Sequence, residues 1–123
     1  MNADLQLGRL GQISRSVRDI DESKRFYGDM LGLPHLFTFG NLSFFDCDGT
    51  RLFLEQSDAP GSQSVLYFQV PDIVAAHATL QSRGIIFTNP PHMIYRHEDG
   101  TEEWMAFFND PEGRPLAIIA QVK

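Results

Sequence analysis

The chain has 123 residues, 42% of them hydrophobic and 21% charged, which is typical of one folded domain and unlike a disordered or fibrous chain. Ten Lys and Arg against sixteen Asp and Glu residues give a net charge of −6, which argues against nucleic acid as a partner. No apolar run approaches the ~20 residues that span a bilayer, and residues 1–9 do not resemble a signal peptide, so we expect a cytoplasmic protein without membrane contact.

The first elements of the chain are a strand and a helix. Apolar positions alternate with polar ones over residues 12–17, which indicates a strand. A helix is predicted over residues 20–31, because Asp19 and Glu22 have the spacing of a capping box and an apolar stripe follows. Gly32 is a typical residue for ending that helix.

A hairpin follows the first helix. Aromatic and β-branched residues at 42–46 and 51–55 predict two strands, and residues 47–50 predict the turn between them. Cys47 is the single cysteine, so an internal disulfide is excluded. We interpret Cys47 as a hairpin residue, and a role as nucleophile is the alternative.

The second half of the chain repeats the first. Residues 12–20 align with residues 65–73 at a constant offset of 53, and Asp72 takes the capping position before a second helix that stops at Gly84. Further strands are predicted at residues 87–89, 93–96, 103–109 and 116–122.

Two segments rich in turn residues separate these elements. Residues 58–64 are the predicted connector between the halves, and Asn89-Pro90-Pro91 predicts a long loop in the second half. The sequence therefore predicts one α+β domain, residues 1–123, made of two βαβββ repeats at about residues 10–57 and 64–122.

Two motifs add a family resemblance to this pattern. Residues 23–33 read Ser-Lys-Arg-Phe-Tyr-Gly-Asp-Met-Leu-Gly-Leu, and residues 109–116 read Asn-Asp-Pro-Glu-Gly-Arg-Pro-Leu. With the duplicated unit, they resemble the vicinal oxygen chelate superfamily, which includes glyoxalase I, bleomycin and fosfomycin resistance proteins, extradiol dioxygenases and methylmalonyl-CoA epimerase. The resemblance spans residues 10–122 and implies the fold more specifically than any reaction.

In that superfamily the two halves form a curved mixed sheet around a cup, with the helices outside. Strand alternation then predicts which side chains face the cup. The expected ligand-binding set is Gln12, Ser14, Ser16, Phe53, Tyr67, Gln69, Trp104 and Ile119. Arg15 falls on the helix side, where we expect its stem to pack and its head to reach water. Filling of the core is the alternative role for Phe53.

The resemblance also implies four metal-ligand positions. They fall on Gln12, on Glu55 or Phe53, on Val65 and on Ala117. Val65 and Ala117 have no donor atom, whereas catalytic metal sites normally have three protein ligands. We therefore expect no divalent metal centre and no cofactor.

Displaced ligands are the alternative to a metal-free site. His92, His97 and Glu103 lie within a predicted loop and hairpin above the cup, and His and carboxylate groups can bind zinc or iron. Their spacing matches no ligand motif, so solvated loop residues are the simpler interpretation.

The resulting functional hypothesis is a protein of the glyoxalase/bleomycin-resistance type that binds a small organic ligand and forms a homodimer. Its alternative is an enzyme of the same superfamily, a glyoxalase-like lyase, isomerase or dioxygenase that uses Gln12, Glu55 and displaced metal ligands. Glu55 is the tentative catalytic acid or base, because an apolar wall would disfavour its charge. Equally, Glu55 can simply end a strand.

Overall fold

The computed structural model describes residues 9–10, 12–61 and 64–123. The chain divides into two compact units, Met1–Gly61 and Ser62–Lys123. Each unit contains one βαβββ repeat, so the α+β class and the repeat architecture predicted from the sequence are confirmed. The parts of the first repeat and of the connector that fall on residues 11 and 62–63 lie outside the described residues.

The first unit is a four-stranded sheet with one helix. Its elements are β1 (Gln12–Val17), α1 (Ile20–Lys24), η1 (Arg25–Met30), β2 (His35–Phe39), β3 (Leu42–Cys47) and β4 (Thr50–Gln56). The strand order is β1-β4-β3-β2, with β1 parallel to β4 and the other pairs antiparallel. Asp19 caps α1 as predicted, because its Oδ1 accepts a hydrogen bond of 3.0 Å from the Glu22 backbone N–H.

The helix of the first unit is not α-helical throughout. After Lys24 it widens into the π-helical segment η1, whose last bond joins Leu31 N–H to the carbonyl of Phe26, five residues earlier, at 2.9 Å. Gly28 allows this segment to approach the sheet, since a Cβ there would lie 3.1 Å from Cε2 of Phe45. The prediction of one regular helix to residue 31 is therefore wrong in its geometry, although its location is right.

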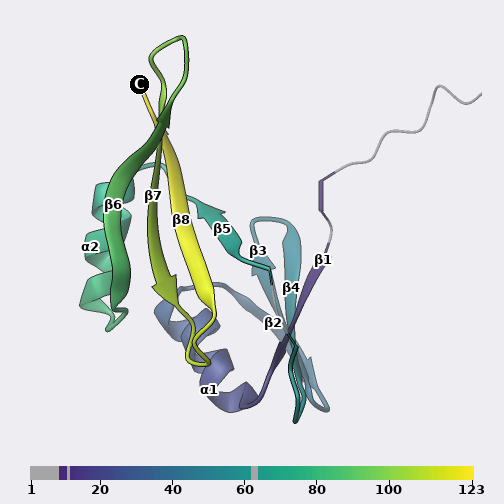
Figure 1. Ribbon diagram of the computed structural model, residues 1–123. Helices are drawn as coiled ribbons and strands as arrows, with labels where there is room; N and C mark the ends of the chain where they lie inside the picture. The colour runs from purple at the N-terminus through teal and green to yellow at the C-terminus, as the bar shows by residue number, and fades with distance from the viewer. Residues whose placement is uncertain (1–8, 11, 62–63) are drawn as a thin grey trace, which may run out of the picture. The chain divides into compact units, whose positions relative to one another are not determined.

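The second unit repeats this plan (Figure 1). Its elements are β5 (Leu66–Gln69), α2 (Ile73–Ser82), β6 (Phe87–Arg96), β7 (Glu102–Asn109) and β8 (Pro115–Val122). The strand order is β5-β8-β7-β6, again with one parallel pair, β5 and β8. Asp72 caps α2 through a 3.0 Å bond from Ala75 N–H, so the repeated capping position is confirmed.

The loop predicted at Asn89-Pro90-Pro91 is instead part of β6. The pairing of β6 with β7 shifts register between Asn89 and His92, which leaves the two prolines in a bulge. β6 is the edge strand of its sheet, where residues without an N–H are tolerated. Sequence alone could not reveal this, because it does not show which strand lies at the edge.

The core of each unit lies between the helix and one face of the sheet. In the first unit Phe26 and Tyr27 are buried together with Phe45, Leu52 and Leu54. In the second unit α2 covers the buried side chains of Ala106, Phe108, Leu116, Ile118 and Ala120.

Arg15 lies among the core residues of the first unit. Its side chain is 2% exposed, so the expectation that its head reaches water is wrong. Neither helix in the described ranges has the length and apolar character that crossing a bilayer requires.

Candidate functional site

The face of the first sheet that points away from α1, hereafter the open face, carries most of the predicted site. Strand register places Ser14 beside Phe53 and Ser16 beside Glu55, with Gln12 beside Arg51. Because side chains alternate along a strand, all of them project from one face. The prediction that Gln12, Ser14, Ser16, Phe53 and Glu55 share a face is confirmed, while their roles stay predictions.

Three phenylalanines form a stacked row across this open face. Phe37 of β2 stacks on Phe44 of β3 with ring centroids 4.4 Å apart, and Phe44 stacks on Phe53 of β4 at 5.1 Å and 15°. Phe37 is 45% exposed, and Phe44 and Phe53 are half-buried. An exposed aromatic surface of this kind is uncommon on a protein unless it contacts something. Phe53 therefore lies outside the helix-side core.

Arg51 lies beside the row of phenylalanine rings and forms a hydrogen bond with Gln12. The Nε of Arg51 donates a 3.0 Å hydrogen bond to Oε1 of Gln12, and its guanidinium carbon lies 5.5 Å from the ring centroid of Phe44. The Gln12 oxygen is the atom that would ligate a metal, and it already accepts a bond from a cation. A second cation at this oxygen would be repelled by the guanidinium.

Glu55 lies at the other end of the open face. Four residues of β4 separate it from Arg51, the partner of Gln12, so Gln12 and Glu55 are about 13 Å apart along the strands. Metal–oxygen bonds are only about 2 Å long, so one ion cannot be held by both groups in an ordinary geometry. The Glu55 side chain is exposed, and its role as an acid or base stays a prediction.

The corresponding face of the second sheet points away from α2. It carries Tyr67 and Gln69 of β5 beside Ala117 and Ile119 of β8, as predicted. The rings of Tyr67 and Phe107, whose strands flank β8, approach each other edge to face at 6.2 Å. Ala117 lies between them in register and is 0% exposed. Ala117, one of the implied metal-ligand positions, is therefore buried and also has no donor atom.

A chain of hydrogen bonds crosses the same face. Gln69 donates to Gln121 at 2.7 Å, Gln121 donates to Glu103 at 2.8 Å, and the other Glu103 oxygen lies 2.8 Å from Nε2 of His97. The bonds from Gln121 and His97 lower the pKa of Glu103 below its usual range. His92 stands apart, with its Nδ1 2.7 Å from the Pro90 carbonyl oxygen. The displaced ligand set therefore does not assemble, and the described residues contain no group of three or more His, Cys, Asp or Glu side chains that could hold a metal ion.

The lowered pKa of Glu103 predicts a pH dependence of stability. A carboxyl group whose pKa is lower in the folded chain stabilises the fold above its unfolded pKa, about 4.3, and loses that contribution as the pH falls through the folded value. We expect Glu103→Gln to reduce the fall in melting temperature between neutral pH and about pH 3. An unchanged slope in a melting series against the wild type would contradict this.

Trp104 does not lie on the face of the second sheet that points away from α2, so its predicted place in the cup is wrong. It pairs with Ala120, whereas Met105 pairs with Ile119, which puts Trp104 on the face that α2 covers. Its indole N–H donates to Glu102 at 2.8 Å, which satisfies the expectation that it needs a partner. The face on which Trp104 lies is decided by the pairing of β7 with β8.

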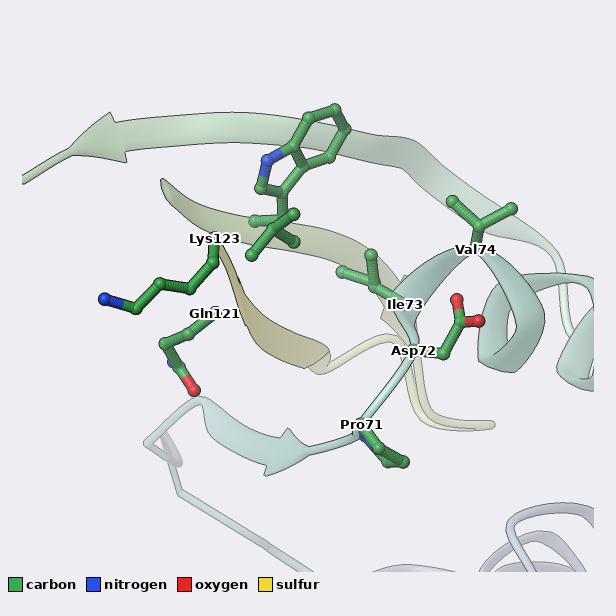
Figure 2. Close-up of a pocket in the computed structure, with 8 residues that line it drawn as sticks. Pro71, Asp72, Ile73, Val74, Gln121 and Lys123 are labelled. Atoms are coloured by element: carbon green, nitrogen blue, oxygen red, sulfur yellow. The ribbon is translucent and has the colours of Figure 1, made fainter. Parts of the chain in front are cut away.

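Trp104 instead lines a separate pocket of about 410 Å³ beside the start of α2. Figure 2 shows Ile73 directed into the space between α2 and the sheet, and the Lys123 amine directed away from Asp72. That amine lies 3.5 Å from Asp99, and the Asp72 carboxylate caps α2. The charged groups around this pocket are therefore engaged elsewhere.

Cys47 ends β3 at the hairpin turn, as predicted. Burial raises the pKa of its thiol, and the neighbouring carboxylates of Asp46 and Asp48 raise it further. Because the thiolate is the reactive form, we expect iodoacetamide to modify Cys47 slowly at pH 7.5 and much faster in denaturant. Mass spectrometry of timed samples measures both rates, and equal rates would contradict the prediction.

Several residues of the open face were missed from the sequence. Arg51 has the same strand parity as Phe53 and Glu55, so alternation could have identified it. Phe44 could not be assigned, because Phe44 and Phe45 are adjacent and alternation alone does not show which one faces the helix. Phe37 belongs to β2, a strand whose bounds the sequence pattern left undefined.

Comparisons with known proteins agree with this architecture. Residues 9–118 match the model of the Glyoxalase/Bleomycin resistance protein/Dioxygenase superfamily. The chain therefore belongs to this superfamily, whose fold the two βαβββ units form.

Individual relatives are distant in sequence. An uncharacterized protein of Bacillus subtilis (strain 168), YraH, is 28% identical over 89% of this chain and 96% of its own length. A glyoxalase/bleomycin resistance protein/dioxygenase from Alicyclobacillus acidocaldarius is similar in structure, with a TM-score of 0.76, 19% identity and coverage of 93% and 92% of the two chains. A superfamily member from Sphaerobacter thermophilus has a TM-score of 0.72, 25% identity and coverage of 94% and 99%.

The residues present do not fit the metal centre that the superfamily implies. In the second unit the implied ligand positions fall on Val65 and Ala117, whose side chains have no donor atoms. In the first unit the Gln12 oxygen accepts a bond from Arg51, and Glu55 is too distant to share an ion with Gln12. Fewer than the three protein ligands of an ordinary catalytic site remain.

Proposed function

We propose that the protein binds a small organic ligand on the open face of its first unit, without a divalent metal. The observation that carries this proposal is the stacked row of Phe37, Phe44 and Phe53, exposed beside the polar side chains of Arg51 and Glu55. Apolar surface with a few placed polar groups is the usual composition of a small-molecule site. The metal-free part of the proposal is supported by the lack of donor atoms at Val65 and Ala117, two of the positions where the superfamily implies metal ligands.

A metal titration tests the metal-free part. We expect Zn²⁺, Ni²⁺, Mn²⁺ or Fe²⁺ added to chelator-treated protein to leave the melting temperature unchanged, since a ligand that does not bind the folded state cannot stabilise it. Elemental analysis after dialysis should show less than stoichiometric metal. Stoichiometric uptake together with a raised melting temperature would contradict the proposal.

A screen tests ligand binding itself. Aromatic and amphipathic metabolites are added to the chelator-treated protein, and those that raise the melting temperature are titrated by calorimetry. Recovery of the ligand unchanged after incubation supports binding without turnover. Conversion to a product by the metal-free protein would instead identify an enzyme of the superfamily.

A further inference from the structure

The second unit has a pocket on the side of its sheet that α2 covers. β5 ends at Gln69 opposite Ile119, and the chain then turns into α2, whereas β8 continues to Val122. The ends of β7 and β8 therefore extend beyond the start of the helix, as Figure 1 shows. Together with the start of α2 they border the pocket of about 410 Å³ that Trp104 lines, hereafter the Trp104 pocket.

The Trp104 pocket lies apart from the side chains that carry the proposed function. The aromatic row belongs to the first unit, whereas all residues that line this pocket belong to the second. Within the second sheet, Trp104 and Val122 project from the side that α2 covers, opposite to Tyr67 and Gln69. A ligand in the Trp104 pocket would therefore be additional to one on the open face.

Trp104 is held in one orientation by hydrogen bonds at the edge of its ring. Its indole N–H donates to Oε1 of Glu102 at 2.8 Å, and Oε2 of Glu102 accepts a bond from Nε of Arg96 at 3.1 Å. Trp104 is half-buried, so part of the indole surface faces the pocket. A ring that is already fixed loses little conformational freedom when a ligand packs against it, which favours binding.

The rest of the lining combines apolar side chains with one charge of each sign. Ile73 and Val122 are apolar, and the two charged residues of the lining are Asp72 and Lys123. The Asp72 carboxylate caps α2 at the positive end of the helix dipole, and the Lys123 amine lies 3.5 Å from Asp99. The lining therefore presents no net charge that a charged ligand would match.

We infer that the Trp104 pocket binds a small, flat, uncharged aromatic molecule, whose ring packs against the indole of Trp104. The volume of about 410 Å³ lies within the range of about 300–1,000 Å³ that is usual for small-molecule sites. Aromatic pairs in offset or edge-to-face arrangements are stabilised beyond the apolar area that they bury. An aromatic ring therefore gains more in this pocket than a saturated ring of the same skeleton.

A nuclear magnetic resonance titration of the full chain tests the ligand class. The chain has one tryptophan, so the single indole N–H cross-peak of the isotope-labelled protein belongs to Trp104. The probes are 2-naphthol and decahydro-2-naphthol, which share one ring skeleton and are uncharged at pH 7. We expect 2-naphthol to shift the Trp104 cross-peak to saturation and to bind about 2- to 10-fold more tightly than its saturated analogue. Equal affinities, or tighter binding of decahydro-2-naphthol, would overturn the inference.

A variant that fills the pocket tests the position. Val122→Phe places a larger side chain beside Trp104 and should weaken 2-naphthol binding at least about 5-fold. Ile86→Phe adds the same ring at a residue that is 84% exposed and outside the pocket, and it should bind as the wild type does. Equal affinity of Val122→Phe and the wild type would contradict the position. If circular dichroism shows that Val122→Phe does not fold, nuclear Overhauser effects between 2-naphthol and the wild-type Trp104 indole decide: their presence supports the position, and their absence overturns it.

The location of the shift changes separates this inference from the proposed function. Amide shifts confined to the first unit, with the Trp104 cross-peak unmoved, would overturn the inference and leave the open face as a ligand site. A saturable Trp104 response without changes on the first unit supports the inference, and the metabolite screen then decides the proposed function separately.

Discussion

Replacing Phe45 by alanine should lower the free energy of unfolding by about 3–5 kcal/mol, the usual cost of deleting a buried aromatic ring. Phe45 is 1% exposed, lies edge to face against His35 at 5.4 Å, and packs where Gly28 brings η1 onto the sheet. Gly28 has no side chain with which to fill the cavity. Equilibrium denaturation in urea measures the loss as a shift of the midpoint at constant slope.

Phe44 provides the matched control for this substitution. It is the next residue on β3, projects from the opposite face and is half-buried. Phe44→Ala should therefore cost clearly less, about 1–2 kcal/mol, since only part of the ring leaves water on folding. Equal losses for the two variants would show that the two faces of the sheet have been assigned wrongly.

Phe44→Ala should have its larger effect on ligand binding. The ring stacks on both Phe37 and Phe53 and lies beside the Arg51 guanidinium, so its loss removes the centre of the row and the support of its neighbours. We expect hits from the metabolite screen to bind about 10- to 100-fold more weakly, from the lost apolar contact and aromatic pairing. Calorimetry of the wild type and the variant measures the ratio.

A binding control separates this effect from altered stability. Val74→Ala changes an exposed apolar residue of α2, 65% exposed, outside the open face. Its affinity for the same ligands should match that of the wild type. Unchanged affinity in Phe44→Ala, at a temperature where both proteins are folded, would show that the ligands bind elsewhere.

The sequence predicts the fold well because its signals are local and repeated. The aspartates at positions 19 and 72 cap the two helices at the same bond length, and the turn residues separate the strands. These local signals did not predict the features that depend on contacts between elements distant in the sequence. The prolines at positions 90 and 91 are accepted because β6 is an edge strand, and η1 widens where glycine permits contact with the sheet.

The candidate site could be predicted only in part. Alternation correctly grouped Phe53 with Glu55, because residues two apart on one strand share a face. That Ser14 shares this face depends on the parallel pairing of β1 with β4. It misplaced Trp104, since whether a strand residue faces the helix depends on pairing with β8, which sequence does not give. The stacked row itself depends on register between three strands, and register is set by the turns and the core together.

The most direct test of metal-free ligand binding on the first unit is a nuclear magnetic resonance titration of chelator-treated protein with a confirmed hit. We expect amide shift changes concentrated on β2, β3 and β4, which carry the aromatic row, and on the neighbouring β1, saturating at one ligand per chain without added metal. Shift changes confined to the second unit, or changes that appear only after a divalent cation is supplied, would contradict it.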